Sequence, residues 1–166
     1  LRGLPFVDLA YLRKSDLRDN VITYRRRKTG RPLSVTLTPE ALELLKKYMN
    51  RDSHSPYLFS LLKSGEGTKE AYREYQLALR SFNQQLTLLG EVLGLNDRLS
   101  SYTARHTWAT TAYYCEIHPG IISEAMGHSS IKVTETYLKP FRNKKIDEAN
   151  NQVIDFVKHS IAGVVA

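Results

Sequence analysis

The chain has 166 residues and a formal net charge of +7 at pH 7, because 24 lysines and arginines outnumber 17 aspartates and glutamates. A chain of this length forms one domain that buries roughly 70% of its unfolded surface, and the positive charge favours a polyanionic partner. The single cysteine, Cys115, excludes an internal disulfide and a cysteine-based zinc site, and no apolar run is long enough to span a bilayer.

The N-terminal part predicts a short helix followed by a small sheet. Residues 5–14 are expected to form the helix. Residues 17–27 and 33–37 predict two antiparallel strands, because β-branched and aromatic residues alternate in both. The intervening residues 28–32 contain Gly30 and predict a hairpin loop.

Basic residues are concentrated at this hairpin. Arg25 and Arg27 are expected on one face of the strand and Arg26 on the other, since neighbouring strand residues point to opposite faces. With Lys28 and Arg31 they form a basic patch, which is either solvated or bound to a polyanion.

The rest of the chain predicts helices, so the expected fold is mainly α with a small antiparallel β-sheet near the N-terminus. Thr38 and Pro39 indicate a helix start. The longest helix is expected over residues 68–93, where apolar residues alternate at the three- and four-residue spacing of a coiled coil. We prefer a helix packed on the core, because Gly90 and the Gln84–Gln85 pair are poor coiled-coil residues.

A further helix from Tyr102 onward carries an arginine on its apolar face. Arg105 is spaced from Trp108, Ala109 and Ala112 so that all four share one side of the helix. A buried guanidinium needs an anionic partner. A phosphate is one candidate, because the planar arginine fork fits two phosphate oxygens, and a carboxylate of the same chain is the other.

Two short helices are expected next. Pro119 is suited to the first turn of one helix and Gly127 to its C-terminal end. His128 then begins a turn, Ser129 or Ser130 caps the following helix, and Tyr137 lies near the end of that segment. A helix-turn-helix DNA-binding motif would have the same outline.

Arg105, His128 in a Met-Gly-His-Ser-Ser turn, and Tyr137 together resemble the C-terminal half of the catalytic domain of tyrosine recombinases, the phage integrase family. The resemblance extends from residue 1 to about residue 149. It implies the catalytic-domain fold of that family and DNA strand exchange through a phosphotyrosine bond, for integration and excision of a mobile element or phage.

The resemblance implies a role for each residue. Tyr137 would attack the scissile phosphate, Arg105 would neutralise the developing charge, and His128 would hydrogen-bond the phosphate or assist the tyrosine. Lys28, in a Lys-Thr-Gly loop similar to that of the family, would protonate the leaving 5′ oxygen. The chain has no carboxylate cluster suited to two Mg²⁺ ions, so we expect no metal, cofactor or ATP.

Two positions depart from the family pattern. Tyr102 stands where the family usually has a histidine, and a phenol can donate one hydrogen bond but is a poor base at pH 7. Asp8 matches an acidic position of the family, but the arginine expected three residues earlier is replaced by Pro5. Arg2, one helical turn further back, is either its functional substitute or an exposed residue near the chain end.

Double-stranded DNA is the expected partner, and the expected location is the bacterial cytoplasm. The chain is expected to assemble into a synaptic tetramer on DNA. The expected backbone-binding residues are Arg25, Arg26, Arg27, Arg31, His106 and Lys132. His106 is expected to point about 100° away from Arg105 around the helix axis and so to be a poor substitute for the missing histidine.

Residues 1–166 are interpreted as a single catalytic domain without the N-terminal core-binding domain of full-length integrases. Residues 143–160 form an amphipathic pattern, expected either to pack on a neighbouring protomer or to fold back on their own domain. Two other functions stay open: a catalytically impaired DNA-binding module, and a helical protein–protein interaction domain.

Overall fold

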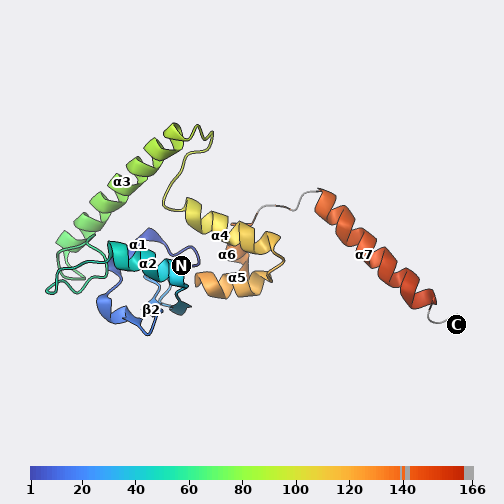
Figure 1. The fold of residues 1–166 in the computed structure, drawn as a ribbon, viewed down its shortest axis with the longest axis horizontal. Helices are drawn as coiled ribbons and strands as arrows, with labels where there is room; N and C mark the ends of the chain where they lie inside the picture. The colour runs from blue at the N-terminus through green and yellow to red at the C-terminus, as the bar shows by residue number, and fades with distance from the viewer. Residues whose placement is uncertain (139, 141–142, 163–166) are drawn as a thin grey trace.

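The computed structural model describes residues 1–138, 140 and 143–162, and it is mostly helical with one three-stranded antiparallel sheet near the N-terminus (Figure 1). This confirms the expected fold class. The elements are α1 (Phe6–Tyr11), the 3-10 helix η1 (Lys14–Asp16), β1 (Leu17–Arg18), β2 (Val21–Arg25), β3 (Pro32–Thr36), α2 (Pro39–Tyr48), α3 (Lys69–Val92), α4 (Thr103–Tyr114), α5 (Pro119–Met126), α6 (Ile131–Glu135) and α7 (Asn143–Ala162).

The sheet contains one strand more than the sequence predicted. The segment expected as a single strand over residues 17–27 turns at Asp19 and Asn20, so that β1 pairs with β2 in an antiparallel hairpin. Both turn residues have positive φ, 48° and 63°, a conformation that aspartate and asparagine tolerate better than other side chains. The expected continuous strand was therefore wrong, and β2 also ends earlier, at Arg25.

The first helix is also shorter than predicted. It ends at Tyr11 because the next residues are extended and pair with a distant segment. The Leu12 carbonyl accepts a hydrogen bond from the Leu58 amide over 2.8 Å, and Arg13 forms an isolated bridge with Tyr57. Tertiary pairing thus overrides the helical pattern that the sequence suggested for residues 12–14.

Two clusters of buried residues form the core of the described chain. The N-terminal cluster joins α1, the sheet and α2 and contains Leu12, Ile22, Leu37, Leu45 and Leu58. The C-terminal cluster joins α4 and α5 and contains Ala109, Ala112, Ile122 and Met126. The candidate site lies where these two parts of the chain meet.

Helix α3 has the predicted bounds but not the predicted burial. Thr68 caps its start, and its hydroxyl accepts a hydrogen bond from the Ala71 amide. Phe82 stacks on Phe6 at 5.0 Å between ring centroids, yet it is 41% exposed. Leu89 and Leu93, in the C-terminal part of the helix, are exposed, and Figure 1 shows this end extending away from α1 and α2. The expected packing on the core is therefore found for only part of the helix.

Helix α7 covers the segment expected to be amphipathic. Figure 1 shows it apart from the rest of the fold. An ion pair of 2.5 Å between Lys145, in its first turn, and Glu116, just after α4, links the two helices. Its large apolar side chains are exposed, namely Ile146, Val153, Ile154, Phe156 and Val157. No helix in the described part of the chain combines the length and apolar character needed to cross a membrane.

Candidate active site

Arg105 lies on the buried side of α4, as the helical spacing predicted, and is 2% exposed. Its guanidinium donates hydrogen bonds to the carbonyls of Gly3 and Met126, each over 2.8 Å. Among the ion pairs of the described residues, none joins Arg105 to a carboxylate, so the internal salt bridge considered for it is not what the structure contains. Its charge is left available to an anion from outside.

Gly3 is required where Arg105 approaches the N-terminal segment. Its φ of +66° is a left-handed conformation, and a Cβ atom at this position would lie 2.8 Å from the Cα atom of Arg105. Any other residue would combine backbone strain with a steric clash. The N-terminal segment can therefore lie directly against the arginine.

His128 follows Gly127, which ends α5 in the left-handed conformation that the sequence predicted. The imidazole is 4% exposed, with Nε2 located 2.8 Å from Nη2 of Arg105 and Nδ1 located 2.8 Å from Oγ1 of Thr134. Because arginine can only donate, Nε2 accepts this bond, and Nδ1 therefore carries the proton that Thr134 accepts. Burial, followed by the charge of Arg105, lowers the pKa of His128 to about 4. The ring is neutral at pH 7.

Tyr137 lies just beyond α6, against both of these residues. Its ring centroid is 4.9 Å from that of His128 and 5.8 Å from Cζ of Arg105. The backbone is fixed on both sides: its amide donates to the Thr134 carbonyl, and its carbonyl accepts a bond from the Thr110 hydroxyl. The structure thus brings together the arginine, histidine and tyrosine that the sequence identified.

His106 also contacts Tyr137, and sequence reasoning missed this contact. The two rings stack with centroids 4.4 Å apart. The helix geometry correctly separated His106 from the buried side that holds Arg105. However, the chain after α6 places Tyr137 against both His106 and Arg105, which lie on different sides of α4. No local pattern in the sequence indicates this contact.

Arg26 is buried, whereas Arg25 and Arg27 are exposed, which confirms the expected alternation of faces. Its Nε atom lies 2.6 Å from Oδ2 of Asp8, within ion-pair distance but without the alignment of a hydrogen bond. Its Nη1 atom donates to the carbonyl of Met126. At 5% exposure, Arg26 is not part of the surface patch to which we had assigned it.

Asp8 is the carboxylate of this buried cluster. Its Oδ1 atom accepts a hydrogen bond from the Arg27 amide over 2.9 Å, and its side chain is 2% exposed. Burial raises the pKa of Asp8, against the opposing effects of the Arg27 amide and the Arg26 charge. The acidic position recognised in the sequence is therefore occupied by a residue that holds Arg26.

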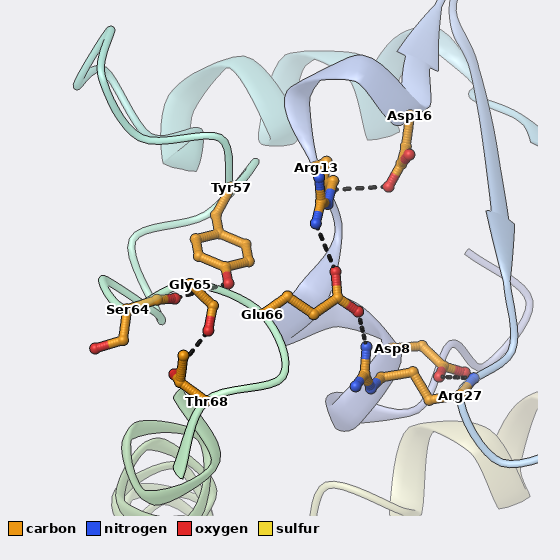
Figure 2. Close-up of polar contacts among 9 residues, drawn as sticks. All are labelled: Asp8, Arg13, Asp16, Arg27, Tyr57, Ser64, Gly65, Glu66 and Thr68. Carbon is orange, nitrogen blue, oxygen red and sulfur yellow. Dashed lines mark hydrogen bonds and ion pairs between the residues drawn. The ribbon is translucent and has the colours of Figure 1, made fainter. Parts of the chain in front are cut away.

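Arg27 points away from the cluster, toward the loop before α3. Figure 2 shows the carboxylate of Glu66 between Arg13 and Arg27, with which it forms ion pairs. The Arg27 guanidinium also lies over the ring of Tyr11, 3.8 Å from its centroid. These contacts fix Arg27 on the opposite side of the hairpin from Arg26.

The hairpin loop lies over the turn that carries His128. Arg31 donates a hydrogen bond to the His128 carbonyl, and the Thr29 hydroxyl donates to the Gly127 carbonyl over 3.3 Å. Lys28 is exposed in this loop, and its charge contributes to the lowered pKa of His128, after burial, Arg105 and Arg26. Lys28 is therefore at the edge of the site.

These observations agree with a comparison of the sequence with known families, because a model of the phage integrase family matches residues 3–144. This chain belongs to the phage integrase family. It is similar to the tyrosine recombinase XerC of Haemophilus ducreyi, with 29% identity over 134 residues, which cover 78% of this chain and 42% of that protein.

Solved structures of integrase-family proteins share the fold. The crystal structure of XerA recombinase has a TM-score of 0.62 at 21% identity and covers 91% of this chain and 52% of that chain. The Tn1549 transposon integrase, in complex with transposon right end DNA, has a TM-score of 0.62 at 15% identity and covers 92% of this chain and 56% of that chain. The present chain spans about half the length of these proteins.

Two predicted residues, Arg2 and Lys132, are not joined to the cluster of Arg105, His128 and Tyr137 by the contacts of the described residues. Arg2 has a left-handed φ of 51° and donates a hydrogen bond to the Ser34 carbonyl over 3.2 Å, so its guanidinium is directed to β3. Lys132 is exposed on α6. Tyr102 precedes α4 and is 45% exposed, and its ring lies beside that of His106, with 6.3 Å between the centroids. Across residues 1–138, 140 and 143–162, no group of histidine, cysteine, aspartate and glutamate side chains could hold a metal ion.

Proposed function

We propose that this chain cleaves and rejoins DNA strands at specific sites through a 3′-phosphotyrosyl intermediate, with Tyr137 as the nucleophile. The observation that supports this most directly is the buried guanidinium of Arg105. It forms no ion pair with a carboxylate of the described residues, and it lies beside a neutral histidine and the Tyr137 ring. A phosphate of DNA supplies the missing negative charge.

In the proposed reaction the Tyr137 oxygen forms a bond to phosphorus while the bond to the 5′ oxygen breaks. Arg105 stabilises the charge that develops on the non-bridging oxygens, and removing one such donor typically costs about 3 kcal/mol of barrier. Lys28 donates a proton to the leaving 5′ oxygen, and the phenolic proton of Tyr137 passes to solvent. Attack by a 5′ hydroxyl of a partner strand reverses these steps, so the phosphodiester energy is conserved.

His128 serves this reaction by hydrogen bonding rather than by storing a proton. A histidine with a pKa of about 4 is almost entirely neutral at pH 7 and holds a proton poorly. Its Nε2 atom orients the Arg105 guanidinium, and Thr134 fixes the ring through Nδ1. We propose that His128 and Thr134 keep the site in one geometry before DNA binds.

Double-stranded DNA is the proposed partner, and the net charge of +7 supports it. The Tn1549 transposon integrase, whose solved structure contains transposon DNA, supports a role in moving a mobile element. The exposed apolar side chains of α7 support exchange of this helix between protomers of a synaptic tetramer. The reaction would take place on DNA in a bacterial cytoplasm.

The proposal is tested with a suicide DNA substrate that carries a nick near the cleavage point. An active chain becomes trapped as a covalent adduct that survives denaturing electrophoresis. Tyr137→Phe should abolish the adduct and retain DNA binding, because the ring contacts persist without the hydroxyl. Tyr114→Phe is the matched control and should form the adduct normally. An adduct that persists in Tyr137→Phe would assign the nucleophile to another residue.

A catalytically silent DNA-binding module is the second candidate, favoured by Pro5 at a position where the family has arginine. This function predicts DNA affinity that falls with salt, at a log–log slope of about −0.9 per phosphate contact, but no adduct. A helical protein–protein interaction domain, suggested by the exposed faces of α3 and α7, predicts no salt-dependent DNA affinity.

A further inference from the structure

Arg26 is a second buried arginine near the site. The roles proposed for Arg105, His128 and Tyr137 do not account for it. The family pattern places an arginine at the position of Pro5, and the nearby Arg2 is directed to the Ser34 carbonyl instead. Arg26, which comes from the end of β2, is buried in the same part of the molecule as Arg105.

The two guanidiniums converge on one backbone atom. Arg105 and Arg26 both donate hydrogen bonds to the carbonyl oxygen of Met126, the last residue of α5. Each therefore lies within hydrogen-bonding distance of the same oxygen, and the charge of Arg26 acts on Arg105 as a repulsion. Two donors that share one oxygen are also placed to share one phosphate group.

The charges of this cluster do not cancel. Within the described residues, Asp8 forms an ion pair with Arg26, and Arg105 has no carboxylate partner. Lys28 adds a further positive charge at the edge of the site. Buried charges of one sign are costly unless an anion compensates them, so the cluster is electrostatically incomplete without one.

Gly127 makes the position of Arg26 possible. A Cβ atom on Gly127 would lie 2.9 Å from Cγ of Arg26, and the φ of +65° would also strain any other residue. The glycine that ends α5 and precedes His128 thus also leaves the space through which the Arg26 side chain reaches the site. This fit ties the hairpin residue to the turn that carries His128.

We propose that Arg26 is the second phosphate-binding arginine of this site, and that it replaces the arginine that the family carries where this chain has Pro5. This inference rests on the proposed function. Arg105 and Arg26 would contact the non-bridging oxygens of the scissile phosphate, and Asp8 is a positioning residue that orients Arg26. The competing role for Arg26 is purely structural, as a link between the hairpin and α5.

The two roles are separated by a suicide substrate with a methylphosphonate at the scissile position. The methyl group replaces a charged non-bridging oxygen, so this linkage is neutral and has less need of a guanidinium. On the phosphodiester, Arg26→Ala should slow adduct formation by about 100-fold or more, while on the methylphosphonate the loss should be less than about tenfold. A structural link would produce the same loss on both substrates and would overturn the inference.

Matched variants keep the test interpretable. Arg13→Ala, at an exposed arginine that also pairs with Glu66, should react at nearly the wild-type rate on both substrates. Arg26→Ala leaves Asp8 buried without its partner, so Asp8→Asn combined with Arg26→Ala is measured in parallel. If both variants unfold in a thermal melt, Arg26→Lys retains the charge but not the planar fork. It should lose more of the wild-type rate on the phosphodiester than on the methylphosphonate, and an equal loss on both substrates would overturn the inference.

The wild-type chain separates this inference from the function on which it rests. If the wild type forms no adduct on the phosphodiester, the proposed function fails and the inference fails with it. If the wild type forms an adduct through Tyr137 and Arg26→Ala does so at the same rate, the proposed function stands and the inference alone is overturned.

Discussion

Nη2 of Arg105 lies 2.8 Å from Nε2 of His128, and this contact fixes the protonation state of the imidazole. An arginine has no acceptor, so the histidine nitrogen must be unprotonated for the contact to be a hydrogen bond. Protonating His128 would place a third positive charge beside Arg105 and Arg26, in a buried site. The lowered pKa of His128 follows from this arrangement.

The protonation of His128 should therefore appear in the stability of the fold. The pKa is about 4 in the folded chain and near 6.5 in the unfolded chain, so the unfolded state binds the extra proton between these values. Stability from this group is complete above pH 6.5 and is lost as the pH falls toward 4, by at most about 3 kcal/mol. Urea unfolding at a series of pH values measures this loss.

The control for this measurement is the other histidine at Tyr137. His128→Asn should reduce the loss of stability on acidification, whereas His106→Asn should leave it unchanged, because His106 is exposed. If the stability of the wild type and that of His128→Asn depend on pH in the same way, the fold does not hold His128 in the neutral form.

Lys28 is predicted to be the general acid. Lys28→Ala should slow cleavage of ordinary DNA by about 10²- to 10⁴-fold, the usual contribution of a positioned acid. A 5′-thiol leaving group needs no proton, so Lys28→Ala should cleave a substrate with this group at nearly the wild-type rate. Arg25→Ala, which alters a neighbouring exposed cation of the same hairpin, should not distinguish the two substrates. Equal slowing by Lys28→Ala on both substrates would reduce Lys28 to a phosphate contact.

Arg2 is predicted to be dispensable for the chemistry. Its guanidinium binds the Ser34 carbonyl, so Arg2→Ala should change the cleavage rate by less than about threefold, whereas Arg105→Ala should reduce it by about 10²- to 10³-fold. Single-turnover adduct formation measures both. A loss in Arg2→Ala comparable to that in Arg105→Ala would mean that Arg2 moves into the site when DNA binds.

The sequence predicted the elements whose signals are local. Thr38 and Gly127 marked the ends of helices correctly, because side-chain capping and left-handed glycine act within a few residues. The Asp19–Asn20 turn was missed although both residues favour it, because the strand pattern of residues 21–25 was extended back across it to Leu17.

The contacts between distant segments could not be predicted in this way. The burial of Arg26 depends on a carbonyl at Met126, and the stacking of His106 on Tyr137 depends on the path of the chain after α6. Neither contact leaves a periodic pattern in the sequence. By contrast, the apolar spacing around Arg105 predicted its burial, because both belong to the same helix face.

Helix α7 is predicted to act on assembly rather than on the stability of the monomer. Deleting the chain from Asn150 onward should leave the thermal midpoint of the monomer within about 2 °C, since the apolar residues of α7 are exposed. The same deletion should abolish higher-order complexes on DNA in analytical ultracentrifugation. Phe156→Ser is a milder version of this change and should weaken the same complexes. A lower midpoint for the truncated monomer would mean that α7 folds back on its own domain.

The hydrogen bonds to Met126 have a mechanical consequence. Arg26 belongs to the part of the chain that holds the N-terminal cluster, and Met126 belongs to the C-terminal cluster, while Arg105 reaches back from α4 to the Gly3 carbonyl. The arginines thus bridge the seam between two separately cored halves. A phosphate gripped by both would act as a clasp across that seam, so that the chain would be most rigid at the moment when a strand is held for cleavage.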